Sequence, residues 1–420
     1  MSASEPVLRT ADGVPLPVKL RRSARRSRLT AVAFVIPLFA FTLFSFIIPI
    51  GTLLFRSIHS PTVADALPDT IDALRHWDAT ALPDEATFAI LARELVAARK
   101  AEVVGRVATQ LNFERGGLRT MVTETARKLE KVPNGPYQPA MLAINSDWGQ
   151  LSTWAAIRNA GKRYTASFYL AAIDHTYDVR GGIVPTDPED RIYVTLFVRT
   201  LWVSLLITGI CLLLGYPIAY LMANVPTRIS NLLMIMVLLP FWTSLLVRTT
   251  AWIVILQREG VLNQLLIWLG LVDENNTFIL IYNMAGTIIA MTQILLPFMI
   301  LPMFSVMKTI PPSYVRAAES LGATPERAFF SVYFPNSVPG IGAGSLLVFI
   351  LAIGYYITPS LVGGRTGQLI SNFIAYHMQS SLNWGLAGAL SGILLLGVLG
   401  LFIIYNRVVG IDNLKLGYGR

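Results

Sequence analysis

Five polar or aromatic side chains interrupt the long apolar segments of this sequence and are the first candidates for chemistry. Arg248 lies well inside one such segment, and Trp252, Gln293, Tyr355 and Tyr356 lie in the same or later ones. A charge at membrane depth is costly and often functional, and aromatic faces suit an organic cation. All five are candidates for contact with a solute. Each also has a packing interpretation, which for Arg248 is an internal salt bridge or hydrogen bonds to backbone carbonyls.

Other reactive residue types are arranged unfavourably for catalysis or metal binding. The four histidines are scattered without metal-ligand spacing, and the single cysteine, Cys211, lies in an apolar segment, as expected of a small core residue. Gly161-Lys162 is the nearest match to a phosphate-binding loop, but Arg163 follows it in place of Ser or Thr. The sequence therefore predicts no catalytic site, no metal and no cofactor bound by this chain.

Composition indicates an integral membrane protein. Of the 420 residues, 54% are hydrophobic and 14% are charged, and the mean hydropathy is +0.55. Six apolar stretches are each long enough to cross a hydrocarbon core of roughly 30 Å: 29–55, 192–222, 231–256, 277–307, 340–362 and 385–405. We predict an all-α membrane protein with six transmembrane helices. The first is expected to be an uncleaved span, because it exceeds the apolar region of a signal peptide.

The distribution of lysine and arginine predicts the orientation. A basic cluster within residues 1–28 precedes the first span, and such clusters remain in the cytoplasm. Six crossings then place the 308–339 loop and the 411–420 tail in the cytoplasm, with the 192–410 segment holding the remaining five spans. The net charge of +9 follows from this topology and requires no nucleic acid.

The 56–191 segment between the first two spans is the one sizeable polar piece. Asp84 is positioned to cap apolar residues at helical spacing up to Lys100, and residues 118–132 show a similar pattern. The 164–170 stretch alternates weakly and leaves strand or helix open. We expect a mainly helical insertion, which is extracytoplasmic in the predicted orientation.

The 308–339 loop carries the most specific pattern of the chain. Ser313 is positioned to cap a short helix, and Gly322 supplies the left-handed residue that ends it. Thr324 and Pro325 form a second cap and first-turn pair, so another short helix begins at once. Two short helices joined by a glycine make a rigid knob on the membrane surface, shaped for a soluble partner.

The pattern R-A-A-x-x-L-G-A at 316–323, followed by V-Y-F-P at 332–335, resembles the EAA loop of the membrane subunits of binding-protein-dependent ABC importers. The stretches 200–223, 239–252, 260–263 and 358–364 are similar to the polyamine-type branch, so the resemblance covers about 160–410. By this resemblance, the residues that couple the loop to an ATPase are Arg316, Ala317, Ala318, Glu319, Leu321, Gly322, Ala323 and Pro335.

Arg316 departs from the family pattern, which usually has Glu at this position. Both residues suit a helix, so the knob should keep its fold. The change removes any ion pair that the Glu would make, and we expect the ATPase partner to carry a matching acidic residue.

The resemblance implies a multi-pass permease subunit of a bacterial inner membrane that moves a small organic solute into the cytoplasm. A polyamine is the leading candidate, while an amino-acid-derived or opine-like solute, a sulfate-type anion and another organic cation remain open because Arg248 would oppose a cation. The implied partners are two copies of an ATP-binding subunit, a second permease subunit that is identical or homologous, and an extracytoplasmic solute-binding protein, besides the membrane lipid. ATP is then bound by the partner, and this chain is not itself an enzyme.

Two other classes are weaker alternatives. A self-sufficient secondary transporter or channel needs no docking knob and often carries intramembrane carboxylates, whereas no Asp or Glu falls inside the six stretches. A membrane sensor or enzyme needs a catalytic domain that the short cytoplasmic tails do not supply. For the 56–191 insertion, two roles remain open: contact with the solute-binding protein, or packing on the mouth of the pathway.

Overall fold

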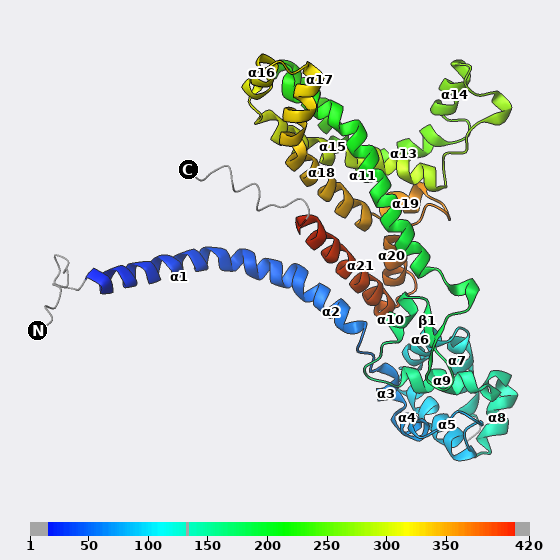
Figure 1. Cartoon of the computed structure of the whole chain (residues 1–420). Coiled ribbons are helices and arrows are strands. Elements are labelled where there is room, and N and C mark those ends of the chain that lie inside the picture. Colours follow the sequence, from blue (N-terminus) through cyan, green and yellow to red (C-terminus); the bar gives the residue numbers. More distant parts are fainter. Residues whose placement is uncertain (1–15, 132–133, 408–420) are drawn as a thin grey trace, which may run out of the picture. The chain divides into compact units, whose positions relative to one another are not determined.

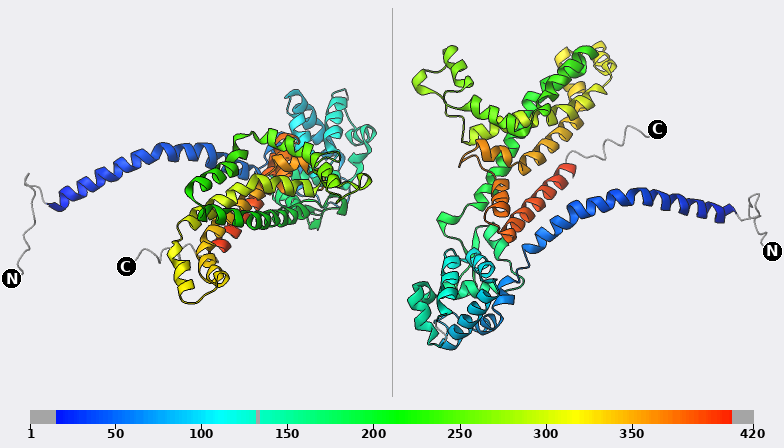
Figure 2. Two further views of the ribbon diagram at one scale, coloured as in Figure 1. Left: turned by 90° about the horizontal axis from the view of Figure 1, so that it is seen from above. Right: turned by 180° about the vertical axis from the view of Figure 1, so that it is seen from behind.

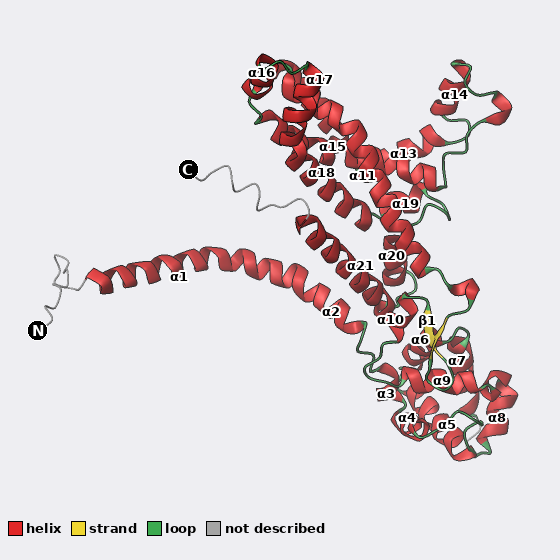
Figure 3. Cartoon of the chain, in the orientation of Figure 1, coloured by secondary structure: helices red, strands yellow, loops and turns green. Residues whose placement is uncertain are grey.

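The structure, a computed structural model, describes residues 16–131 and 134–407 and is built almost entirely of helices (Figure 3). The prediction of a mainly helical protein is confirmed. The 411–420 tail and the first fifteen residues of the expected 1–28 tail lie outside the described residues. The chain divides into two units, Met1–Arg56 and Ser57–Arg420.

The described part of the first unit is one long helix. Helix α1 (Leu16–Thr42) passes through a π-helical turn at Leu43–Ile47 into α2 (Ile48–Arg56). The irregular turn precedes Pro49, which has no amide hydrogen to continue the α-helical ladder. The Ser27–Arg56 stretch is long and apolar enough to cross a membrane, and its large apolar side chains are exposed, as contact with lipid requires.

The second unit begins with a group of short helices that corresponds to most of the expected insertion. Their bounds are α3 Thr62–Ala66, α4 Pro68–Arg75, α5 Glu85–Lys100, α6 Val104–Glu114, α7 Leu118–Leu129, α8 Tyr137–Ile144, α9 Leu151–Ala160 and α10 Ser167–Ala172. Asp84 caps α5 by accepting a 3.0 Å hydrogen bond from the Thr87 amide, as the sequence predicts.

These helices enclose a core of their own around two buried tryptophans. The Phe88 and Trp154 rings meet edge to face at 4.6 Å, and Trp148 lies against Trp154 at 5.7 Å. Both indoles are satisfied, because Trp148 Nε1 donates to Thr125 Oγ1 at 3.0 Å and Trp154 Nε1 donates to the Trp148 carbonyl at 2.9 Å. Large aromatic groups thus bury their area without leaving a polar atom unpaired.

A short antiparallel hairpin and one buried aspartate join this insertion to the spans. Strands β1 (His175–Tyr177) and β2 (Ile183–Pro185) pair in the register His175↔Pro185. The carboxylate of Asp174, which is only 7% exposed, accepts hydrogen bonds from the amides of Tyr193 (3.0 Å) and Val194 (2.8 Å). Asp174 therefore caps the next helix from outside it, at the end where the helix dipole favours a negative charge.

The rest of the second unit corresponds to the expected 192–410 segment. Its helices are α11 Tyr193–Asn224, α12 Thr227–Leu238, α13 Leu245–Leu256, α14 Val261–Trp268, α15 Met284–Lys308, α16 Pro312–Ser320, α17 Pro325–Ala328, α18 Phe334–Gly354, α19 Ile357–Val362, α20 Ile370–Gln379 and α21 Trp384–Tyr405. Helices α11, α15 and α18 pack side by side (Figure 1). A Cβ atom at Gly344 would lie 2.9 Å from the Met299 carbonyl oxygen, so small residues permit this close approach.

The insertion and the 308–339 loop lie at opposite ends of the packed helices. In both views of Figure 2 the short helices of the insertion gather at one end of α11, and α16 and α17 lie at the other. Asp174 caps the first turn of α11, whereas Asn224, its last residue, donates to the Tyr333 hydroxyl at 3.3 Å. The 32 residues of α11 span about 48 Å, which exceeds the thickness of the hydrocarbon core.

Five helical segments of the described chain are long and apolar enough to cross a membrane, and a bent helix pair makes a sixth candidate. The five are Ser27–Arg56, Pro188–Asn224, Met284–Lys308, Pro325–Gly354 and Trp384–Tyr405. The bent pair falls in the 231–256 stretch, where the sequence suggests one continuous span. Its two arms, Thr227–Trp242 and Leu245–Trp268, meet at 95°.

The 340–362 stretch also differs from the single span expected. The helix starts earlier, at Pro325, ends at Gly354, and a separate short helix begins at Ile357. Tyr355 and Tyr356 lie at the break between these two helices, so they are not mid-helix residues as the sequence suggests.

Candidate functional site

Gly322 ends the first helix of the 308–339 loop in the conformation that the sequence predicts. Its φ is +89°, its amide donates to the Glu319 carbonyl at 2.9 Å, and the Ala323 amide donates to the Ala318 carbonyl at 3.1 Å. This pair of bonds is the Schellman motif. Apart from its chain neighbours, no atom of the described residues lies within 4 Å of a Cβ built on Gly322, so the requirement for glycine comes from the backbone conformation and not from crowding.

The start of this helix differs from the prediction. Ser313 does not cap it, because α16 already begins at Pro312, with Pro311 at the cap position. A proline at the first helical position has the required φ and lacks an amide that would be unpaired there anyway. The second cap is as predicted, since Thr324 Oγ1 accepts from the Arg327 amide at 3.4 Å and Pro325 follows it.

The outer surface of the loop is exposed to solvent. Leu321 is 90% exposed beside the glycine turn, and the Phe330 ring is 67% exposed. Arg316 and Glu319 are also exposed, and within the described residues neither takes part in an ion pair. An apolar residue at the tip with charges beside it is a surface that a protein partner can cover.

The other predicted loop residues differ in exposure. Ala317 and Pro335 are exposed, whereas Ala318 and Ala323 are half-buried in the Schellman turn. The second helix of the knob is also longer than expected, because α17 continues through a π-helical segment at Phe329–Tyr333 into α18. Pro335 lacks the amide hydrogen that would bond one turn back, which accounts for the irregular segment.

An aromatic cluster that the sequence analysis missed fastens the loop to α11. Tyr220 meets Phe329 at 5.6 Å and Tyr333 at 5.1 Å, and Tyr216 lies 6.3 Å from Phe329, all edge to face. Tyr216 and Tyr220 are four residues apart, as are Phe329 and Tyr333, so each pair occupies one helix face. That spacing was the available signal. These ring contacts join the segment that follows α17 to the last turns of α11.

Arg248 is held by the backbone at the bend between α12 and α13. Its Nη2 donates to the carbonyl oxygens of Pro240 and Thr243, the latter at 3.2 Å, and its guanidinium lies 5.8 Å from the centre of the Phe241 ring. These carbonyls end the first arm of the bent pair, where the second arm has not yet begun. The arginine thus supplies donors to a helix end that has no further turn to pair with.

Two of the remaining pathway candidates meet and one lines a pocket. Trp252 Nε1 donates to Gln293 Oε1 at 3.2 Å, which links α13 to α15. Tyr355 is half-buried and packs against the core around α15, whereas Tyr356 lines a pocket. That pocket measures about 420 Å³, and its lining combines aromatic rings with amide and hydroxyl groups: Tyr356, Ser360, Gln368, Asn372, Phe373, Ala375, Tyr376, Gln379 and Ser380.

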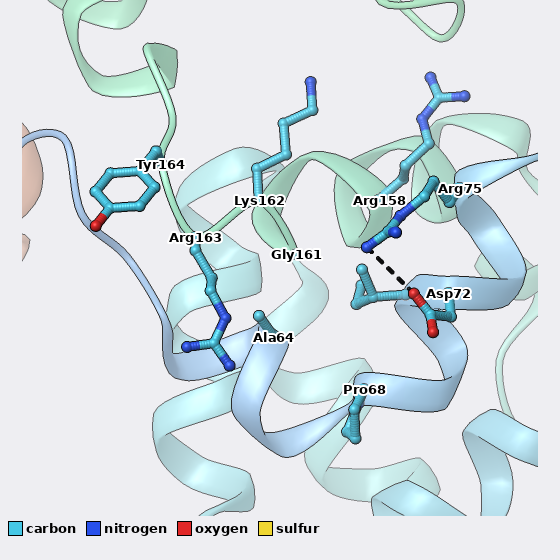
Figure 4. Close-up of a pocket in the computed structure, with 10 residues that line it drawn as sticks. Ala64, Pro68, Asp72, Arg75, Arg158, Gly161, Lys162, Arg163 and Tyr164 are labelled. Atoms are coloured by element: carbon cyan, nitrogen blue, oxygen red, sulfur yellow. Dashed lines mark ion pairs between the residues drawn. The ribbon is translucent and has the colours of Figure 1, made fainter.

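A larger pocket of about 580 Å³ lies in the insertion (Figure 4). Two of its four basic side chains pair with carboxylates, Arg75 with Asp72 at 3.2 Å and Arg163 with Asp65 at 2.7 Å. Lys162 lies over the Tyr177 ring at 4.8 Å, and Arg158 donates to the carbonyls of Trp77 and Val179. Among the described residues, these ion pairs therefore balance half of the pocket's basic side chains.

Gly161 and Lys162 do not form a phosphate loop. Gly161 ends α9, and a Cβ there would lie 2.2 Å from Ile71 Cδ1, so this glycine permits close packing. Nearby, burial raises the pKa of Glu114, while a hydrogen bond with Ser167 and the charge of Lys162 oppose the rise.

Comparison with known proteins identifies the family of this chain. The family model "Binding-protein-dependent transport system inner membrane component" matches residues 215–409. The chain is 35% identical over 228 residues to the spermidine/putrescine transport system permease protein PotB of Salmonella typhimurium, an alignment that covers 54% of this chain and 78% of that one. The chain belongs to this family. It is the permease subunit of an ABC importer, as the loop pattern predicts.

A second relative agrees with this assignment. PotB of Haemophilus influenzae is 36% identical over 221 residues, covering 51% of this chain and 77% of that protein. Among solved structures, the crystal structure of a bacterial alginate ABC transporter in complex with a periplasmic protein matches with a TM-score of 0.41 and 19% identity, covering 52% of this chain and 78% of that chain.

The binding-protein-dependent permease region does not extend over the whole chain. The family match begins at residue 215, inside α11, and therefore leaves out the first unit and the insertion. It includes the bend at Arg248, the Trp252–Gln293 pair, the 308–339 loop and the pocket beside Tyr356.

Proposed function

We propose that this permease imports a polyamine such as putrescine or spermidine and that its 308–339 loop docks on an ATP-binding subunit. The observation that carries the coupling role is the exposed Gly322 turn, with Leu321 at its tip, at the end of α11 opposite the insertion. ATP binding and hydrolysis belong to that partner, of which two copies are expected. Its closure moves the loop, and the aromatic contacts to Tyr220 pass the movement to the spans.

The orientation proposed for the chain follows from this role. The loop must face the cytoplasm, where ATP is available, and the insertion at the other end of α11 is then extracytoplasmic. The first span and the remaining spans place both termini in the cytoplasm of an inner membrane. A second permease subunit and an extracytoplasmic solute-binding protein complete the importer.

The cationic solute is supported by the relatives and by the pocket beside Tyr356. Two relatives that are 35% and 36% identical to the aligned part of this chain are spermidine/putrescine permeases. The pocket offers tyrosine and phenylalanine rings together with amide oxygens, a combination that binds ammonium groups. Arg248 keeps its positive charge, but its guanidinium is held at the carbonyls of Pro240 and Thr243 and does not line this pocket.

Affinity purification of the full-length tagged chain tests the coupling role. An ATP-hydrolysing subunit should copurify with the wild-type chain and be lost with Gly322→Val, because a β-branched residue is strongly disfavoured at a φ of +89°. Gly322→Asn should retain the partner, since Asn tolerates this conformation. Gly209→Val is the matched control, because Gly209 lies within α11 and has no atom within 4 Å of its Cβ position.

Uptake of labelled putrescine in the same strains tests the solute. Accumulation that requires the chain, and that excess spermidine inhibits, is the expected result. If the ATPase copurifies but neither putrescine nor spermidine is taken up, the importer assignment stands and the proposed polyamine substrate is wrong. A chain that purifies alone would reject the coupling role.

A further inference from the structure

Three arginines line one pocket at the end of α11 that adjoins the insertion. Arg191, Arg199 and Arg365 surround a volume of about 340 Å³. Within the described residues, none of the three has a carboxylate at ion-pair distance. Three guanidinium groups without a counter-charge repel one another. Arg191 Nε already donates to the Thr186 carbonyl and Arg199 Nη1 to the Gln368 carbonyl, and the other N–H donors of the three side chains remain for a bound anion.

α11 presents one of these arginines, and a second lies just before the helix. Thr195 and Arg199 are four residues apart and share one face of α11, whereas Arg191 precedes the first helical residue, Tyr193. The acidic residues of the preceding turn, Asp187 and Asp190 among them, are exposed and form no ion pair with this face.

The facing wall is a loop held in a fixed conformation. Gly364 has a φ of +54°, and a Cβ there would lie 2.2 Å from the Tyr282 carbonyl oxygen, so the backbone is tightly packed. Arg199 Nη1 donates to the Gln368 carbonyl at 3.5 Å, and the Ile370 amide donates to Thr200 Oγ1 at 2.9 Å. The loop is thereby tied to α11 at two neighbouring points, so the pocket is formed before any ligand arrives.

The depth of Arg199 places the pocket at the level of lipid head groups. Arg199 precedes Asn224, the last residue of α11, by 25 positions, or about 37 Å of helix. This exceeds the roughly 30 Å of hydrocarbon, so Arg199 lies just outside it when Asn224 lies at the other surface.

The floor of the pocket is apolar. Ile192, Leu196 and Phe373 line it together with the three arginines. A ligand that satisfies both halves carries a phosphate-type anion attached to a hydrocarbon. A free inorganic anion would satisfy only the arginines.

We propose that this pocket binds the phosphate of an anionic phospholipid, with Arg191, Arg199 and Arg365 around the phosphate and the glycerol and acyl carbons against Leu196 and Phe373. The lipid comes from the leaflet at this end of α11, which is the outer leaflet in the orientation proposed above. Arginines near the outer ends of spans run against the usual distribution of positive charge, and a lipid phosphate supplies the compensation that the chain itself lacks.

Native mass spectrometry of the full-length chain in detergent tests the proposal without depending on its orientation. Phosphatidylglycerol and phosphatidylcholine are added at equal concentration, and the lipid retained by the protein is counted. The wild-type chain should retain phosphatidylglycerol in preference to phosphatidylcholine. The Arg199→Gln/Arg365→Gln variant should lose about tenfold or more of the phosphatidylglycerol affinity, since each charged hydrogen-bond partner contributes strongly.

Matched variants separate lipid recognition from loss of folding. Arg199→Lys/Arg365→Lys keeps the charge and should retain part of the preference. Arg258→Gln, which removes an exposed arginine that donates to Thr277 Oγ1 in a different loop, should bind lipid as the wild type does. Elution at the wild-type volume in size-exclusion chromatography shows that each variant is folded.

Four outcomes would overturn the proposal. Equal retention of the two lipids by the wild-type chain, or undiminished phosphatidylglycerol binding by the folded double glutamine variant, would show that the arginines do not select an anionic phospholipid. Displacement of phosphatidylglycerol by millimolar inorganic phosphate would assign the pocket to a soluble anion. If the double glutamine variant binds lipid normally but loses a soluble protein that copurifies with the wild type, the pocket would be assigned to an acidic protein surface.

Discussion

The rings of Tyr220 and Tyr333 meet edge to face with their centroids 5.1 Å apart. This contact joins the last turn of α11 to the segment that leaves the coupling loop, the 308–339 loop. It is therefore placed to carry a movement of the loop into the spans without taking part in the docking surface itself.

Tyr220→Leu should weaken this connection while leaving the docking surface intact. Tyr220 makes two edge-to-face contacts, each worth about 0.5–1.5 kcal/mol beyond the buried area. We expect the ATPase subunit to copurify as before, and solute transported per ATP hydrolysed in proteoliposomes to fall several-fold. Tyr220→Phe keeps the ring and should behave like the wild type. Loss of the ATPase subunit with Tyr220→Leu would instead place this tyrosine in the docking interface.

Arg248→Leu should destabilise the protein more than it alters solute affinity. The substitution leaves the carbonyls of Pro240 and Thr243 without their donor, which costs about 1.5–3 kcal/mol for a bond to a charged group. We expect a lower melting temperature in detergent and a reduced maximal uptake rate with an unchanged KM. Arg258→Leu, in an exposed loop, serves as the control. An unchanged melting temperature with a KM raised tenfold would show that Arg248 contacts the solute.

Local signals in the sequence were sufficient to predict the turn in the 308–339 loop. A glycine after a helical run and a Thr-Pro pair each have one common backbone solution, and both occur as expected at Gly322 and Thr324. The predicted cap at Ser313 was wrong, because the helix already begins at Pro312, with Pro311 at the cap position. The length of the apolar segments likewise predicted where the spans lie. A long apolar segment is unfavourable in water whatever its tertiary contacts are.

Features that depend on contacts between distant segments were not predictable in this way. The 95° bend between α12 and α13 looks like a continuous apolar run in sequence, and Arg248 was ambiguous because its partners, eight and five residues earlier, are backbone atoms. Asp174 lies in the insertion but caps a helix that begins nineteen residues later. Arg191, Arg199 and Arg365 come together only through the packing of the 363–369 loop on α11.

Trp252→Phe and Gln293→Leu should raise the KM for uptake by similar amounts, and the two effects should not be additive. Each removes the 3.2 Å hydrogen bond between the indole and the amide oxygen, a neutral bond worth about 1 kcal/mol. We expect the KM for uptake to rise about fivefold in either variant and little further in the double variant. Trp268→Phe is the control, because Trp268 is 81% exposed on α14. Additive effects would mean that the two side chains act separately.

Glu114→Gln should remove part of the pH dependence of the stability of the insertion. Burial raises the pKa of Glu114 above its ordinary value, so the folded chain binds this proton more tightly than the unfolded chain does. Its contribution therefore favours folding at low pH and is lost as the pH rises through the ordinary pKa toward the raised one.

Subtracting the two chains isolates this contribution from the carboxylates with lowered pKa values, such as Asp84, whose stabilising effect has the opposite sign. Unfolding of the full-length chain in detergent, followed by the fluorescence of its tryptophans, two of which are buried in the insertion core, should show Glu114→Gln gaining stability relative to wild type as the pH rises from about 4 to neutrality. A difference between the two chains that stays constant over this range would mean that Glu114 has the same pKa in the folded and unfolded states.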